Sequence, residues 1–384
     1  MQDNEKKPAL RFKGFTDPWE QRKLGDLCVE FRSGEFISAS DITETGEYPV
    51  FGGNGLRGFT DRFNHDGEYT LIGRQGALCG NVNFAVGKSY FTEHAIAVRA
   101  DKKNQTRFLY YLFSTMDLGQ YSGQSAQPGL AVGNLVELKS TLPDKQEQEK
   151  ISGVLTALDT LITLHQRKYE KLVNIKKSML DKMFPKNGAS VPEIRFKGFT
   201  DPWEQRKVGT LIEDYTEKTV TQNQYPVLTS SQQQGIVLQE DYFADRQVTT
   251  DNNVGYYVLP KGYFTYRSRS DTDVFVFNRN NIVDKGIISY YYPVFAPKSC
   301  DSNFLLRRLN HGIKKQLSMA AEGTGQKVLA HAKFKNMVVD VPSQSEQEKI
   351  GTILEELDTL ITLHQRKLEK LQNIKKSCLE KMFV

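Results

Sequence analysis

The chain contains two copies of one structural unit, and this internal repeat limits its fold more than any other feature. Residues 11–23, RFKGFTDPWEQRK, recur without a change at 195–207. A second match joins 147–184 to 346–383 through the shared pieces EQEKI, DTLITLHQRK, EKL, NIKKS and KMF. The stretches between these matches, which we call the variable regions (24–144 and 208–342), share little sequence. Such a repeat predicts two structural units with constant ends as a frame and variable regions that are free to differ.

The second match predicts two long amphipathic helices. Apolar residues recur at spacings of three and four in both copies, which is typical of one apolar face on an α-helix. Asp144 precedes Glu147 by three residues, as Ser343 precedes Glu346, and this resembles a capping box at each helix start. Each match spans 38 residues. At a rise of about 1.5 Å per residue, each helix should form a rod on the order of 57 Å long.

Each long helix must bury its apolar stripe, and the other long helix has a stripe of the same length and spacing. We therefore expect an antiparallel coiled coil, with the variable regions at opposite ends and a pseudo-two-fold axis relating the halves. The expected residues of the helix-pair seam are Leu158, Ile162, His165, Leu172, Ile175, Leu357, Ile361, His364, Leu371 and Ile374.

The two variable regions share an order of elements despite their divergence. Each opens on Tyr-Pro-Val and continues with Gly-rich or Gln-rich turns, several short strands, a helix and a closing strand before Pro143 or Pro342. The expected strands are 68–72, 81–86 and 95–98 in the first region and 256–259, 273–278 and 286–294 in the second. The expected helices are 107–116 and 303–321. The fold class is therefore α+β, with two globular mixed α/β domains on a pair of long helices.

The repeat divides the chain into six parts. They are an N-terminal constant segment (1–23), the first variable region (24–144), the first long helix (145–185), the repeated constant segment (186–207), the second variable region (208–342) and the second long helix (343–384).

Composition excludes several classes of protein. No run approaches the roughly 20 apolar residues that a membrane span needs, so we expect a cytoplasmic protein without a membrane partner. The four cysteines lie far apart without a Cys-x-x-Cys pair, which argues against a zinc site or a disulfide framework. The net charge is +5, yet the first variable region holds 10 Lys and Arg against 14 Asp and Glu. Charge alone therefore does not indicate nucleic-acid binding.

The sequence lacks the motifs of the enzymes that act on DNA. An amino-methyltransferase should contain an Asn/Asp-Pro-Pro-aromatic motif, but the chain has no Pro-Pro pair. The piece EGTGQK at 322–327 lacks the frame of a Walker phosphate loop, and we expect it to form an exposed turn. The six histidines show no ligand spacing, and no short carboxylate motif suggests a metal-dependent nuclease. These observations favour a protein without a catalytic or metal site.

The repeated RFKGFTDPWEQRK segment, the EQEKI…DTLITLHQRK…EKL…NIKKS helix and the divergent variable regions together resemble a type I restriction-modification specificity subunit. The first variable region also resembles this family in FGGNGLRGF at 51–59 and LIGRQGALCGNVNF at 71–84, whereas the second keeps only the order of elements. The resemblance implies two target-recognition domains, each reading one half of a split, asymmetric sequence in double-stranded DNA.

The same resemblance implies the partners of the chain. The constant helices would set the spacing of the two half-targets and dock two methyltransferase (modification) subunits, while restriction and translocase subunits complete the complex. S-adenosylmethionine and ATP with Mg²⁺ would then belong to the partner subunits, and this chain itself would hold no cofactor.

Candidate DNA contacts follow from the chemistry of base recognition, in which Arg or Lys reads guanine and Asn or Gln reads adenine. Several such residues lie in loops where glycines let the backbone approach a groove. The candidates are Arg57, Arg74, Gln75, Asn81, Gln124 and Gln127 in the first variable region, and Ser230, Ser231, Gln232, Gln233, Gln234, Arg267, Arg269, Gln326 and Lys327 in the second. Trp19 and Trp203 are expected to pack against the base of the helices rather than stack on bases.

Two other functions remain open from the residues alone. A stand-alone sequence-specific DNA-binding protein would explain the variable regions, but it predicts a strongly basic face on both. A coiled-coil scaffold that does not bind DNA would explain the helices, but not variable regions that are rich in Gln, Arg and Gly and equal in element order.

Overall fold

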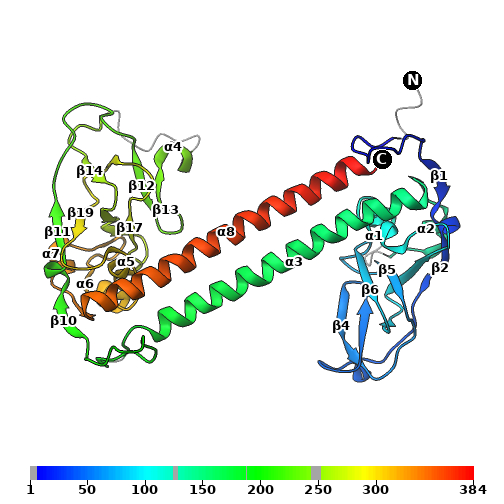
Figure 1. Cartoon of the computed structure of the whole chain (residues 1–384), viewed down its shortest axis with the longest axis horizontal. Helices are drawn as coiled ribbons and strands as arrows, with labels where there is room; N and C mark the ends of the chain where they lie inside the picture. The colour runs from blue at the N-terminus through cyan, green and yellow to red at the C-terminus, as the bar shows by residue number, and fades with distance from the viewer. Residues whose placement is uncertain (1–6, 124–128, 187, 244–251) are drawn as a thin grey trace. The chain divides into compact units, whose positions relative to one another are not determined.

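The computed structural model describes residues 7–123, 129–186, 188–243 and 252–384. The chain forms two compact units, unit 1 from Met1–Arg167 with Gln365–Val384 and unit 2 from Lys168–His364. Each unit combines helices with sheets, so the chain belongs to the expected α+β class (Figure 1). The division falls inside both long helices, α3 (Lys145–Lys182) and α8 (Gln344–Met382). Each unit therefore contains the first half of one long helix and the last half of the other.

Unit 1 is built on an antiparallel four-stranded sheet, against which helix α1 (Thr106–Ser114) packs. In sheet order its strands are β2 (Cys28–Ser33), β8 (Ala95–Ala100), β5 (Glu68–Gly73) and β6 (Val82–Val86). A three-stranded sheet contains β4 (Gly55–Thr60), β3 (Tyr48–Gly52) and β7 (Tyr90–Phe91). A two-stranded ladder joins β1 (Glu20–Lys23) to β9 (Lys139–Leu142). The helices of this variable region are α1 (Thr106–Ser114) and α2 (Val132–Glu137).

Unit 2 repeats this plan with shorter strands. Its four-stranded sheet has the order β11 (Ile212–Tyr215), β19 (Val294–Pro297), β15 (Phe264–Tyr266) and β17 (Phe277–Arg279). The two-stranded ladders are β10 (Glu204–Lys207) with β21 (Val338–Val341), β12 (Leu228–Ser231) with β13 (Gly235–Leu238), β14 (Tyr257–Pro260) with β18 (Lys285–Ile288), and β16 (Arg269–Ser270) with β20 (Lys327–Val328). The helices are α4 (Gln239–Tyr242), α5 (Ser302–Asn310), α6 (Lys314–Ala320) and α7 (His331–Lys335).

The second variable region departs from the sequence prediction at three places. The helix expected at 303–321 is broken into α5 and α6, because Gly312 between them has a φ of 109° that other residues rarely adopt. The strand expected at 286–294 is divided into β18 and β19, and only the end of 273–278 joins β17. The short helix α7 is not expected from the sequence, and neither is α2 in the first variable region, since five or six residues carry little periodicity.

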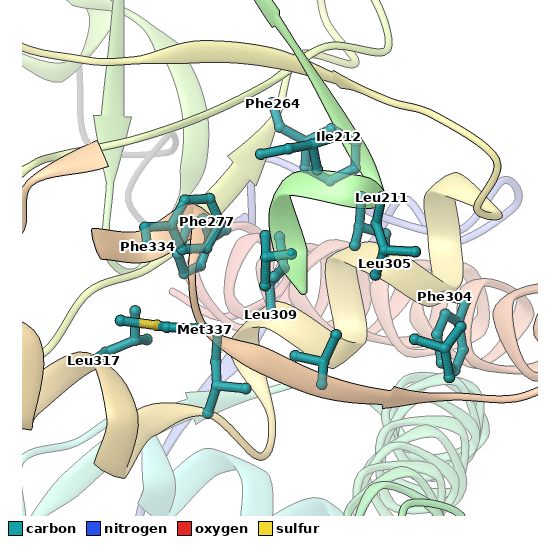
Figure 2. Packing of buried hydrophobic residues seen from close by; sticks show 14 of the residues in the cluster. Leu211, Ile212, Phe264, Phe277, Phe304, Leu305, Leu309, Leu317, Phe334 and Met337 are labelled. Carbon is teal, nitrogen blue, oxygen red and sulfur yellow. The ribbon is translucent and has the colours of Figure 1, made fainter. Parts of the chain in front are cut away.

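Each unit has an aromatic core at the base of its long helices. In unit 1 the Trp19 ring lies 6.3 Å from both Phe108 and Phe383, and the latter two rings stack at 5.4 Å. In unit 2 Trp203 contacts Phe184 and Phe304 in the same way, at 5.9 and 5.8 Å. Figure 2 shows Phe304 among the apolar side chains of the unit 2 core. Both tryptophans therefore pack against the helix base, as expected.

The identical segments are fixed to the helix starts by a buried ion pair. Arg11 donates two hydrogen bonds to Glu147, at 2.7 and 2.8 Å, and Arg195 donates two to Glu346, both at 2.8 Å. Both glutamate side chains are only 1% exposed. Because each Glu binds an arginine, neither completes the expected capping box. Asp144 does cap the first helix by accepting from the Glu147 amide at 2.9 Å.

The second helix start differs at its capping position. The amide of Glu346 donates to the backbone oxygen of Ser343, at 3.0 Å, and the Ser343 hydroxyl instead lies 3.4 Å from that of Ser345. The expected side-chain cap is therefore present in the first helix and replaced by a backbone bond in the second.

The long helices are antiparallel, since each unit combines the first half of one with the last half of the other. Lys375 pairs with Asp159 at 2.6 Å in unit 1, and the repeated pair Lys176 and Asp358 forms in unit 2. Of the expected seam residues, Leu158 and Leu357 are buried, and Leu371 and Leu172 pack against the cores of units 1 and 2. Four more are half-buried, namely Ile162, His165, Ile361 and His364.

Two of the expected seam residues lie at its exposed edge instead. Ile175 and Ile374 are 37% and 39% exposed. The next residue in each helix, Lys176 or Lys375, turns toward the other helix to reach its aspartate. Spacings of three and four both fit an amphipathic helix, so the sequence does not decide which of two neighbouring residues faces the other helix. In the structure the lysine that forms the ion pair faces it, and the isoleucine before that lysine lies at the edge.

Candidate nucleic-acid interface

Most candidate residues of the second variable region meet at one place on unit 2. A small hollow is lined by Ser230, Ser231, Gln232, Arg267 and Arg269, together with Val274, Val276 and Asn278. Gln232 donates to the Val274 backbone oxygen at 3.3 Å. The pairing of Ser270 with Lys327 brings in β20, and Gln326 beside it donates to Asp271 at 3.0 Å. The β12–β13 hairpin, β16 and β20 thus form one polar face from segments that are distant in sequence.

Two serines in this set support the hairpin rather than face outward. Ser231 is 6% exposed, and its hydroxyl accepts from the amides of Gln233 and Gln234, both at 3.2 Å. The Ser230 hydroxyl accepts from the Asn278 amide at 2.8 Å. These contacts turn the three glutamines, 232 to 234, toward solvent. The structure therefore corrects the expectation for Ser231, because a buried hydroxyl that already caps a turn is not free to contact a base.

Exposed aromatic rings border the same face. Tyr290 and Tyr291 are 53% and 43% exposed, and their ring centroids lie 4.2 Å apart. The Arg269 guanidinium lies over the Tyr291 ring, with its Cζ atom 4.4 Å from the centroid. These tyrosines were missed from the sequence, although the run Tyr290 to Tyr292 ahead of a buried strand was an available signal.

Three candidates of the first variable region meet in a similar way on unit 1. A Cβ atom on Gly53 would lie 2.8 Å from the backbone oxygen of His94, so only glycine allows this loop to pack so closely. Arg74 points to the Glu93 backbone oxygen at 3.5 Å. Gln75 Oε1 lies 3.0 Å from His94 Nδ1. The Arg57 stem covers Gly52 in the same loop, so Arg57, Arg74 and Gln75 lie together.

The other candidates of this region lie elsewhere. Asn81 lines a separate hollow of about 310 Å³ with residues of α1 and of the turn at 117–119. Gln124 and Gln127 lie outside the described residues. His94 was missed by the sequence reading because a single histidine in a loop carries no local signal.

The described part of the chain contains no cluster of three or more His, Cys, Asp or Glu side chains that is able to hold a metal ion. All four cysteines are free thiols, and burial raises the pKa of Cys28 and of Cys300 to about 12, which disfavours the reactive thiolate. Among the described residues, no helix has the length and apolar character to cross a membrane.

The turn at 322–327 is exposed, as expected, and it is closed by backbone hydrogen bonds between Glu322 and Val328. Gly323 has a φ of 121°, and a Cβ atom there would lie 2.1 Å from the Gln326 backbone oxygen. This geometry is a tight hairpin connection and does not resemble a phosphate loop.

The model of one protein family matches both halves of the chain. It is the type I restriction modification DNA specificity domain, and it matches residues 16–174 and again 201–373. The chain belongs to the type I restriction-modification DNA specificity family. Each match spans a variable region and most of the long helix that follows it. The family is the non-catalytic, DNA-recognition component of type I restriction-modification systems.

Individual members of the specificity family are similar over part or nearly all of the chain. The EcoprrI specificity subunit of Escherichia coli is 44% identical over 156 residues, which are 40% of this chain and 39% of that protein. The MjaVIII specificity subunit of Methanocaldococcus jannaschii is 22% identical over 94% of this chain and 91% of its own length. A solved S subunit from M. genitalium has the same fold, with a TM-score of 0.68 at 16% identity over 98% of this chain and 99% of that one.

Proposed function

We propose that the chain is the sequence-recognition subunit of a type I restriction-modification complex, in which each variable region reads one half of a split, asymmetric DNA target. The observation that carries this proposal is that two regions with one sheet order present different polar faces on closely similar frames. Equal folds can place two recognition faces equivalently, and different side chains then select different bases. The acidic composition of the first region does not favour a stand-alone DNA-binding protein, which needs a strongly basic face on both regions.

The identical parts of the two units are proposed to dock two copies of one modification subunit. Their identity extends to residues that core packing does not require, such as the exposed leucines of the DTLITLHQRK piece. Leu161 and Leu164 are 42% and 45% exposed, and their repeats Leu360 and Leu363 are 42% and 44% exposed. An apolar surface offered twice suits two copies of one partner. Those partners, with the restriction and translocase subunits, would supply S-adenosylmethionine, ATP and Mg²⁺ in the cytoplasm.

The antiparallel helices are proposed to act as the ruler between the half-targets. Two recognition faces that enter the same side of a duplex must be separated by about one helical turn of DNA or a multiple of it. A continuous helix of 38 or 39 residues provides a fixed length for that purpose.

Co-expression with the modification subunit tests the proposal directly. Sequencing of methylated DNA is expected to show adenine methylation at one split motif. Exchange of residues 208–342 for another variable region should change only one half of that motif, and removal of seven residues from each long helix should shorten the gap or abolish binding. Absence of methylation at any split motif, or a change in both halves, would contradict the proposal and favour a scaffold that does not read DNA.

A further inference from the structure

The two variable regions place one polar side chain at the same position of an equivalent backbone pairing. In the first region the Leu130 amide donates to the Arg74 backbone oxygen at 2.8 Å. The following residue, Gln75, forms an antiparallel bridge with Gly129. Strand β5, which ends at Gly73, leads directly into this pairing.

The second region repeats this pairing without sequence similarity. The Leu329 amide donates to the Ser268 backbone oxygen at 2.9 Å. The following residue, Arg269, pairs with Val328. The preceding strand, β15, lies between β19 and β17 in its four-stranded sheet. Strand β5 lies in the same way between β8 and β6 in the sheet of unit 1. Gln75 and Arg269 are therefore structural equivalents.

Each of these two side chains is exposed and lies against a ring from the same neighbouring turn. His94 Nδ1 is 3.0 Å from Gln75 Oε1, and the Arg269 guanidinium lies over Tyr291. Both rings come from the turn before the strand next to β5 or β15. Their backbone oxygens hold equivalent residues, since His94 accepts from the Arg74 amide at 2.9 Å and Tyr291 from the Ser268 hydroxyl at 2.7 Å. Contact with a ring restricts the rotamers of the glutamine or arginine side chain before DNA binds. Less conformational entropy is then lost on binding.

Other polar groups on the face of unit 2 are held by the protein itself. Gln232 binds a backbone oxygen, and both Gln326 and Arg267 are turned toward Asp271, the latter at 3.8 Å. Arg269 is instead positioned by an aromatic ring, a contact that uses the face of the guanidinium and none of its N–H donors. It is thus the arginine of this face best arranged for a base edge.

We propose that Gln75 and Arg269 are the equivalent specificity-determining residues of the two variable regions, with His94 and Tyr291 as the residues that position them. This inference rests on the proposed function. A glutamine amide matches the N6 and N7 edge of adenine, whereas a guanidinium matches O6 and N7 of guanine. The first half-target therefore contains an adenine read by Gln75, and the second contains a guanine read by Arg269.

The experiment uses the full chain in complex with the modification subunit. The methylated motif of the unaltered complex is determined first, and binding is then measured to a series of duplexes that differ at one base pair of each half-target. Arg269→Gln is expected to lower discrimination at one guanine of one half by roughly 5- to 140-fold, which corresponds to about 1–3 kcal/mol for one bidentate contact. Gln75→Arg should do the same at one adenine of the other half.

Matched variants separate recognition from folding. Arg269→Lys keeps the charge and is expected to retain part of the preference for guanine. Tyr291→Phe keeps the ring and should preserve the motif, whereas Tyr291→Ala should relax the same base pair as Arg269→Gln. Lys103→Ala and Lys261→Ala remove one exposed charge from each unit and should leave discrimination at every position unchanged.

The outcomes distinguish this inference from the proposed function. Loss of discrimination at a single base pair, in the half read by the altered region, supports the inference. An unchanged motif in both variants, or an equal loss of binding to every duplex, overturns it while the specificity role stands. If the unaltered complex methylates no split motif, the proposed function fails and the inference falls with it.

Discussion

The two junctions between variable region and long helix are built differently, although the helices are nearly identical. In unit 1 the Tyr111 hydroxyl donates to Asp159 at 2.8 Å and lies 3.3 Å from the Thr156 hydroxyl. In unit 2 the equivalent side chain is Arg307, which pairs with Glu355 at 2.9 Å and with Asp358. The equivalence follows from the stacked phenylalanine that lies three residues earlier in both helices. A neutral hydroxyl donor in one unit is thus replaced by a charged guanidinium in the other.

Two of the helix positions that differ near this junction contact the variable region. Thr156 is replaced by Glu355, which matches the replacement of the tyrosine by an arginine. Ser152, whose hydroxyl bonds to the Gln105 side chain, is replaced by Gly351. A Cβ atom on that glycine would lie 2.3 Å from the Asp301 carboxylate. Each helix start is therefore fitted to its own variable region at these two positions, while most of the later helix sequence is shared.

Each unit contains one of the two tryptophans of the chain, so a Trp19→Phe background reports unit 2 and a Trp203→Phe background reports unit 1. Urea unfolding followed by tryptophan fluorescence then measures each unit separately, which allows the two junctions to be compared.

The largest effect is expected from Arg307→Ala. Its side chain is 15% exposed, and its removal leaves Glu355 and Asp358 with fewer positive partners. We expect unit 2 to lose roughly 3 kcal/mol of unfolding free energy, at the lower end of the range for breaking a buried ion pair, because both acids are partly exposed. Unit 1 should be unchanged, and Lys315→Ala on the exposed side of α6 is the control. A loss below about 1 kcal/mol would show that the ionic cluster adds little.

Gly351→Ala should cost unit 2 about 2 kcal/mol, within the usual cost of overpacking a buried contact. The added Cβ would meet the Asp301 carboxylate that caps α5, and also the Phe304 amide at 3.0 Å. Ser152→Ala, at the matching position of unit 1, should cost much less because that site already holds a Cβ. Equal urea midpoints for the two variants would contradict the fitted junction.

Tyr111→Phe should cost unit 1 about 1 kcal/mol, the usual net value of one buried hydrogen bond. The effect is smaller than that of Arg307→Ala because Asp159 keeps its ion pair with Lys375. A double-mutant cycle with Asp159→Asn measures the coupling between the two side chains. A coupling free energy near zero would show that the tyrosine acts only through packing.

The smallest expected effect is a difference in acid sensitivity. Burial lowers the pKa of His311, whose ring lies 5.8 Å from Phe184. A histidine with a lowered folded-state pKa binds protons more readily in the unfolded chain, so unit 2 should lose stability as the pH falls below about 6.5. The urea midpoint of unit 2 should therefore fall between pH 7.5 and 5.5, and His311→Thr should reduce the fall. Equal pH dependence in both proteins would exclude His311 as the cause.

The frame was predictable from the sequence because each of its features is local. The apolar spacing gives the helices, and Asp144 before Glu147 gives one helix start. The partner of Glu147 was not predictable, since Arg11 lies 136 residues away and a capping box has the same local sequence. Ile175 was misplaced because spacing alone does not distinguish a residue inside the seam from one at its edge.

The recognition faces were predictable as sets of residue types but not as geometry. Arginines and glutamines beside glycines pointed to loops in which the structure brings several of the candidate residues together. The equivalence of Gln75 with Arg269 depends on strand register, which joins them to residues more than 50 positions away and leaves no trace in the local sequence. The burial of Ser231 likewise depends on the turn that its hydroxyl caps.

Because Phe383 lies in the unit 1 core, the two units become complete at different times during synthesis. Its ring stacks on Phe108 and meets Trp19, and the Leu10 amide binds the Lys381 backbone oxygen at 2.8 Å. Unit 2 is one continuous stretch, Lys168–His364, and has all its residues once that stretch has left the ribosome. Unit 1 is started first and completed last. Loss of residues 365–384 would therefore damage the unit whose other residues are 1–167, and leave the residues of unit 2 complete.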